Sequence, residues 1–85
     1  MITLKEALKI AQDFNGSGIP LSRIADETDD LWIFLLDMDG VVIGRPADIA
    51  VDKKNGRAFR AEPEFMTDEQ LDAWENARQV EVPQE

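Results

Sequence analysis

The stretch LWIFLLDM, residues 31–38, decides how the rest of the sequence can be interpreted. Seven of its eight residues are apolar, and the tryptophan, isoleucine and phenylalanine among them favour extended structure. A strand that is apolar on both faces needs cover on each side, or at least on one side and at both edges. We therefore predict that residues 31–38 form a central strand of a sheet.

A helix is predicted on the N-terminal side, over residues 3–14. Thr3 and Glu6 have the spacing of a capping box, in which each side chain binds a backbone N–H of the first turn. Apolar residues then recur at steps of three and four and form one face. The glycines that follow favour the end of this helix.

A second helix is predicted over residues 67–80, where Thr67 and Gln70 repeat the capping-box spacing. Leu71, Trp74 and Ala77, with Val80 following, would make its apolar stripe. Residues 81–85 are expected to be a frayed tail.

The remaining middle section is predicted to be strands. Residues 23–27 would form a short edge strand, and residues 41–43 would resume extended structure after a turn at Asp39-Gly40. Residues 48–52 and 57–61 flank Asn55-Gly56 and predict a hairpin, because this dipeptide favours the positive φ of a tight reversal. Ile49, Val51 and Phe59 would share its buried face, with the lysines and arginines in water.

The predicted fold class follows from this order of elements. We expect a single α+β domain over residues 1–85. Its antiparallel sheet would have about four strands, a meander that ends in a hairpin, packed with one N-terminal and one C-terminal helix.

Composition excludes several classes of function. The chain of 85 residues has no cysteine and no histidine, which removes disulfides, thiol nucleophiles, zinc sites built from these residues and histidine acid–base catalysis. No apolar run has the length of about 20 residues that a membrane span needs. We expect a cytoplasmic protein that needs no cofactor.

Acidic residues are concentrated near the C-terminus. The net charge is −9, and residues 62–85 hold eight acidic side chains and one basic one. Nucleic acids and anionic membranes are therefore unfavourable partners, and a basic protein is a favourable one. The candidate contact residues are Glu62, Glu64, Asp68, Glu69, Asp72 and Glu75. The alternative is that they form an ordinary solvated helix face.

The sequence Asp37-Met38-Asp39-Gly40 resembles the first motif of haloacid dehalogenase-type phosphatases. There, one carboxylate attacks phosphorus, the second acts as acid and base, and Mg²⁺ neutralises the phosphate. That fold is a doubly wound sheet, which 85 residues cannot build around this strand. We favour a β-turn with solvated carboxylates, and a Mg²⁺-dependent phosphohydrolase is the least favoured alternative.

Four further residues stand out for structural reasons. Trp32 is predicted to anchor the core, and Trp74 to pack the second helix onto the sheet. Tryptophan is also enriched at binding surfaces, which is the alternative for both residues. Gly44 and Pro46 would bend the chain between strands and hold Arg45, a further candidate contact residue, in an outward pose.

Taken together, these motifs resemble the immunity protein 35 family. The resemblance rests on the opening helix at residues 2–8, the strand with Trp32, the Gly44-Arg45-Pro46 step and the hairpin at residues 51–57, and it covers roughly residues 2–62. A hairpin of this Val-Asp-Lys-x-x-Gly type also occurs in other small inhibitory domains, including peptidase-propeptide-like ones.

The resemblance implies a small α+β bacterial protein that neutralises the cognate toxin of a polymorphic toxin system by direct contact. Such a protein needs no catalytic groups, and an acidic surface could occupy a basic toxin cleft. We therefore expect a non-enzymatic binding protein with a basic toxin domain as its partner. The main alternative is a small self-associating or regulatory interaction domain, which would pair through an exposed sheet edge such as Arg23–Glu27. Both a monomer and a homodimer therefore stay open.

Overall fold

The computed structural model describes residues 2–16, 20–36 and 48–82. Within these residues, two helices and a five-stranded antiparallel sheet make up an α+β fold, which confirms the predicted class with five strands in place of about four. The elements in chain order are α1 (Leu4–Phe14), β1 (Leu21–Glu27), β2 (Leu31–Leu36), β3 (Ile49–Asp52), β4 (Ala58–Arg60), α2 (Asp68–Glu75) and β5 (Arg78–Glu81).

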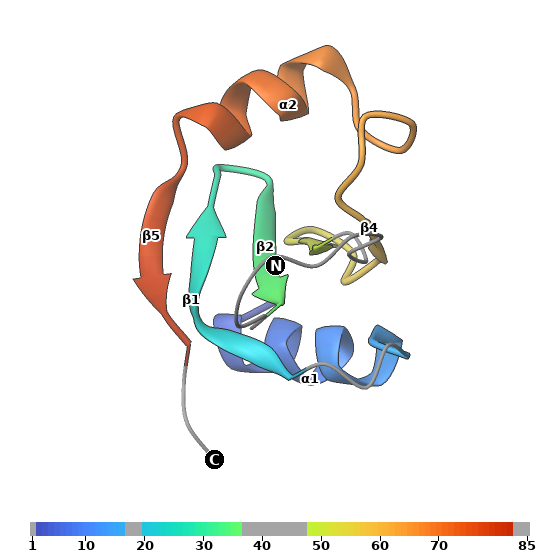
Figure 1. Cartoon of the computed structure of the whole chain (residues 1–85), viewed down its shortest axis with the longest axis vertical. Helices are drawn as coiled ribbons and strands as arrows, with labels where there is room; N and C mark the ends of the chain where they lie inside the picture. The colour runs from blue at the N-terminus through green and yellow to red at the C-terminus, as the bar shows by residue number, and fades with distance from the viewer. Residues whose placement is uncertain (1, 17–19, 37–47, 83–85) are drawn as a thin grey trace.

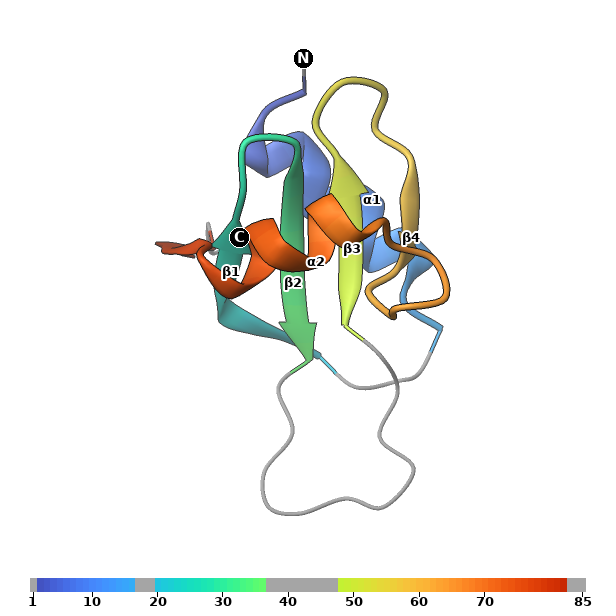
Figure 2. The same cartoon turned by 90° about the horizontal axis from the view of Figure 1, so that it is seen from above.

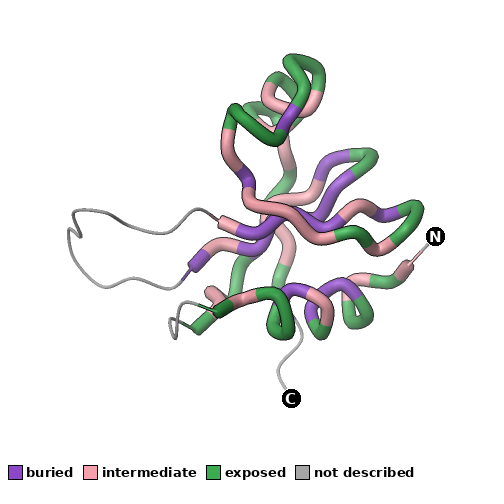
Figure 3. Tube along the Cα trace, turned by 90° about the vertical axis from the view of Figure 1, so that its right-hand side faces the viewer, coloured by how far each residue is buried: buried purple, intermediate pink, exposed green. Residues whose placement is uncertain are grey.

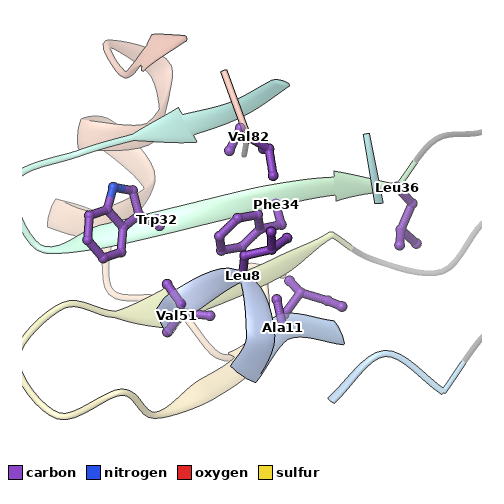
Figure 4. Close-up of a cluster of buried hydrophobic side chains, with 10 residues drawn as sticks. Leu8, Ala11, Trp32, Phe34, Leu36, Val51 and Val82 are labelled. Atoms are coloured by element: carbon purple, nitrogen blue, oxygen red, sulfur yellow. The ribbon is translucent and has the colours of Figure 1, made fainter. Parts of the chain in front are cut away.

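The sheet lies between the two helices, with strand order β4-β3-β2-β1-β5 (Figures 1 and 2). The core therefore has two separate halves. One half is built around α1 and includes Leu8, Phe34 and Val51 (Figure 4). The other lies on the α2 side and includes Leu31 and Ile33.

Strand β2 explains why the central stretch is apolar throughout. Trp32, Phe34 and Leu36 pack on the α1 side, whereas Leu31 and Ile33 pack on the α2 side. Successive side chains of a strand point to opposite faces, and here both faces are covered. The prediction of a central strand is confirmed for Leu31–Leu36.

Helix α2 is shorter than predicted, and the prediction of helix up to residue 80 is wrong. The helix ends at Glu75 with Asn76 as its C-cap, and Arg78–Glu81 form β5, which pairs antiparallel with β1. Val80 and Val82 alternate with the exposed Gln79 and Glu81, and the two valines pack in the core half on the α1 side. This alternation has the period of a strand, which the helical interpretation overlooked.

The predicted frayed tail is wrong for its first two residues. Glu81 lies in β5, and Val82 is only 6% exposed. The backbone N–H of Val82 donates to the carbonyl oxygen of Arg23 at 2.7 Å, because the pairing with β1 continues past β5. Residues 83–85 lie outside the described residues.

Strand β1 is not an edge strand, contrary to the prediction for residues 23–27. It spans Leu21–Glu27 and lies between β2 and β5, so both of its edges are occupied. Ala25 is fully buried in the α1-side core. The edge at Arg23–Glu27 is therefore not open for pairing with a second copy, and the oligomeric state stays a prediction.

The β3–β4 hairpin forms as predicted, but the prediction that Ile49, Val51 and Phe59 share one face is wrong. Ala50 is the pairing partner of Phe59, so these two residues share the α2 side, whereas Ile49 and Val51 face α1. Opposed residues of an antiparallel pair point to the same face, and the sequence did not fix which residues are opposed.

Gly56 alone supplies the positive φ of this turn, at 72°, where its missing Cβ also leaves room for Ile10. Asn55 contributes its side chain, whose Oδ1 accepts the backbone N–H of Arg57 at 2.8 Å. The expected placement of the basic residues in water is wrong for Lys53, which is buried.

Some predictions fall outside the described residues: the end of the 31–38 strand, the extended segment 41–43 and the Asp37–Gly40 motif. Within residues 2–16, 20–36 and 48–82, no helix has the length and apolar character to cross a membrane.

Candidate functional site

The acidic face is presented by α2, and its sequence explains why a helix begins there. Oγ1 of Thr67 accepts the backbone N–H of Gln70 at 3.1 Å, and Oε1 of Gln70 accepts the N–H of Thr67 at 2.9 Å. Asp68 and Glu69 occupy the first turn, where the helix dipole stabilises negative charge. The predicted capping box is thus confirmed.

Two apolar residues hold α2 on the sheet. Leu71 and Trp74 pack against the core half that contains Ile33, and Nε1 of Trp74 donates to Oδ2 of Asp26 at 2.9 Å. No residue within α2 is buried, so the helix lies on the sheet without entering the core (Figure 3). Trp74 packs as predicted, with part of its side chain still in solvent.

The outer side of α2 carries the predicted carboxylates. Asp68, Glu69, Asp72 and Glu75 are all exposed, and their spacing of three and four residues puts them on adjoining turns of one face. Before the helix, Glu64 is exposed and Glu62 is half-buried. Across the described residues, none of these six side chains forms an ion pair.

This arrangement has an energetic cost to the helix itself. Asp68 and Asp72 are one turn apart, where like charges destabilise a helix by about 0.2–0.5 kcal/mol. Glu75 lies in the last turn, which carries no basic residue, although the helix dipole favours a cation there. The charges of Asp72 and Glu75 are therefore not explained by the needs of the helix, whereas those of Asp68 and Glu69 suit its first turn.

A second polar cluster, which the sequence did not predict, joins strands β1 and β5 to the turn that follows β3, at one end of the sheet. Nζ of Lys53 lies 2.7 Å from Oε2 of Glu27, and a guanidinium nitrogen of Arg78 lies 3.3 Å from Oε1 of the same carboxylate. Nζ of Lys53 is also 5.0 Å from the ring centroid of Trp32, within range of a cation–π interaction.

The environment of Glu27 favours its charged form. The hydrogen bond from Lys53 holds the pKa of the Glu27 carboxyl below its ordinary value of 4.5, against the opposing effect of burial, and the charges of Lys53 and Arg78 lower it further. Because Glu27, Lys53 and Arg78 are far apart in the sequence, no local motif signals this cluster. It is best explained as a structural tie between strands β1 and β5 and the turn that follows β3.

Trp32 has the predicted structural role. It is 8% exposed and lies in the α1-side core, where Figure 4 shows it on β2 beside Phe34. The ammonium group of the buried Lys53 lies over the Trp32 ring.

Several candidate residues cannot be placed. Asp37, Asp39, Gly44, Arg45 and Pro46 lie outside the described residues. Within the part of the chain that is described, no group of three acidic, histidine or cysteine side chains could hold a metal ion.

Comparisons with family models, curated proteins and solved structures find no match to this chain.

Proposed function

We propose that this protein is a non-enzymatic binding protein of the immunity type, which neutralises a basic toxin domain through the acidic face of α2. The observation that carries the proposal is the set of exposed carboxylates on α2, Asp68, Glu69, Asp72 and Glu75, which have no cationic partner among the described residues. A toxin that binds nucleic acid presents a basic cleft, and such carboxylates can occupy it in place of phosphates.

The position of α2 also suits this role. The helix begins with a full capping box and is fixed by Trp74, so its carboxylates are held in place before binding. Preorganised charges lose less conformational entropy on association than charges on a flexible tail. A cytoplasmic location is part of the proposal, since a small domain without cysteine suits a reducing compartment.

The test begins with the toxin candidate encoded beside this gene. The proposal expects that co-expression with this protein restores the growth of cells that produce the candidate, and that the two purified proteins bind with salt-sensitive association. Growth that is not restored by the wild-type protein would contradict toxin neutralisation.

Charge reversal then tests the acidic face. Asp68→Lys combined with Asp72→Lys should slow association about tenfold or more at low salt and flatten its salt dependence, because steering depends on these charges. The matched control is Asp13→Lys with Glu81→Lys, which changes the net charge equally at exposed positions on α1 and β5. Equal slowing by both pairs of substitutions would show that the effect comes from net charge alone, and it would rule out α2 as the contact face.

A further inference from the structure

Strand β4 leaves one edge of the sheet open. It is the last strand in the order β4-β3-β2-β1-β5, and Figure 2 shows it at the border of the sheet. The N–H of Asp52 donates to the carbonyl of Arg57 at 2.9 Å, and the N–H of Ala61 donates to the carbonyl of Asp48 at 2.7 Å. Backbone groups alternate in direction along an antiparallel strand, so the backbone N–H and C=O groups of Ala58 and Arg60 point away from β3.

The free backbone groups of this edge can be named. The carbonyl of Arg60 accepts the N–H of Glu62 at 2.8 Å. What remains is the N–H and the carbonyl of Ala58 and the N–H of Arg60, and no strand of the described residues pairs with them. Such an edge is a template for one more strand.

Exposed aromatic rings flank this edge on both faces. The described residues contain three exposed large apolar side chains, Phe14 at 38%, Ile24 at 40% and Phe65 at 57%, and two of them adjoin β4. Phe14 lies on the α1 side, with the guanidinium of Arg60 5.6 Å from its ring centroid. Phe65 lines a hollow of about 280 Å³ on the α2 side, together with Phe59 and Arg57.

The charges of the edge select the occupant. Beside β4, each face offers one exposed aromatic ring and one arginine, Phe14 with Arg60 on the α1 side and Phe65 with Arg57 on the α2 side. Neither arginine forms an ion pair within the described residues. Asp52 also lines the hollow, but its Oδ1 accepts the backbone N–H of Lys54 at 2.8 Å. A second copy joined through the same edge would place two arginines on each face of the joined sheet with no carboxylate to meet them, which is less favourable than an acidic strand.

We propose that the open edge of β4 binds an extended acidic segment of a partner protein by strand addition. Its backbone pairs with Ala58 and Arg60. Its apolar side chains cover Phe14 on one face and Phe65 on the other, and its carboxylates meet Arg60 and Arg57. This surface lies on a different element from the acidic face of α2 and has the opposite charge, so it does not depend on the proposed function.

The test uses a defined probe, an end-capped peptide that repeats Val-Val-Glu-Glu. This repeat places valine and glutamate in turn on each face of an extended strand, which matches the ring and arginine on each face of β4. Titration followed by amide NMR should shift the signals of Ala58 and Arg60 most strongly and slow the exchange of their amide protons. The matched probe, Val-Val-Lys-Lys, should bind at least about tenfold more weakly, because it meets the arginines with like charge.

Substitution of Ala58 distinguishes binding by strand addition from non-specific electrostatic attraction of the peptide. Ala58→Pro removes an N–H that points away from β3 and should weaken binding about tenfold, whereas Ala58→Val keeps the N–H and should bind as the wild type does. Thermal unfolding of both variants checks that they fold. Asp68→Lys with Asp72→Lys should leave the affinity for the peptide within about threefold, which separates this edge from α2.

Three outcomes would overturn the proposal. They are equal binding of the two peptides, shifts centred on β5 or α2, and self-association in sedimentation that Ala58→Pro abolishes. The last would assign the edge to a second copy of the chain.

Discussion

At the scale of single residues, Lys53 is the charged side chain that the described part of the structure buries. Its ammonium group lies between the Glu27 carboxylate and the ring of Trp32, so both its charge and its aliphatic stem are accommodated. Burial of a charge is tolerated where a close partner compensates for lost hydration.

Lys53→Met is expected to lower the free energy of unfolding by about 1–3 kcal/mol, because the stem is kept while Glu27 loses its closest partner. Urea unfolding followed by tryptophan fluorescence measures this loss. Lys54→Met is the control: Lys54 is the exposed neighbour, and its replacement should change stability by less than about 0.5 kcal/mol. Equal effects of the two substitutions would show that the Lys53–Glu27 pair contributes nothing specific.

The lowered pKa of Glu27 predicts how the stability of the protein changes at acidic pH. Because this pKa is lowered in the folded state, the native protein binds fewer protons than the unfolded chain at this site, and stability rises with pH. The contribution is complete above 4.5, the ordinary pKa, and is lost as the pH falls through the lower pKa of the folded state. The stability difference between the wild type and Glu27→Gln should therefore shrink below pH 4.5. A difference that stays constant from pH 7 to acid would contradict the assignment.

At the scale of elements, β5 completes the sheet and closes the edge of β1. Four residues are too few for a stable isolated strand, so β5 depends on its pairing with β1 and on Val80 and Val82 in the core. Residues 78–82 are thereby a structural part of the domain.

Val82→Ala should lower the free energy of unfolding by about 1–2.5 kcal/mol, since it removes buried methyl groups and leaves a cavity. Gln79→Ala, at an exposed position of the same strand, should change it by less than about 0.5 kcal/mol. Chemical denaturation of both variants measures the difference. If Val82 were part of a frayed tail, neither substitution would change the free energy of unfolding.

At the scale of the whole molecule, the two proposed contact surfaces differ in charge. The net charge is −9, and α2 carries exposed carboxylates on the side opposite α1, whereas Lys54, Arg57 and Arg60 lie along the β3–β4 hairpin. The two proposed contact surfaces therefore attract partners of opposite charge.

Excess negative charge should also make stability depend on salt. Raising sodium chloride from 10 to about 150 mM shortens the screening length from about 30 to 8 Å and should raise the melting temperature, because repulsion among carboxylates weakens. Asp68→Lys with Asp72→Lys should reduce this gain, and calorimetric scans at both salt concentrations measure it. A melting temperature that falls with salt would mean that attractive pairs such as Glu27–Lys53 outweigh the repulsion.

The sequence by itself determined the features whose causes are local. Thr3 with Glu6 and Thr67 with Gln70 fix both helix starts, because a capping box involves only neighbouring residues. Gly56 fixes the hairpin turn, and the apolar run of β2 requires cover on both faces. The exposure of the α2 carboxylates also follows from helix periodicity.

Only the tertiary structure decided the features that join distant segments. Arg78–Glu81 form a strand because β1 offers an edge on which to pair, and Phe59 faces α2 because it lies opposite Ala50. Lys53 is buried because Glu27 and Trp32, from two strands, meet it at the end of the sheet. Each of these outcomes depends on the register between strands, which is set by packing across the sheet and is not encoded in any single stretch of the chain.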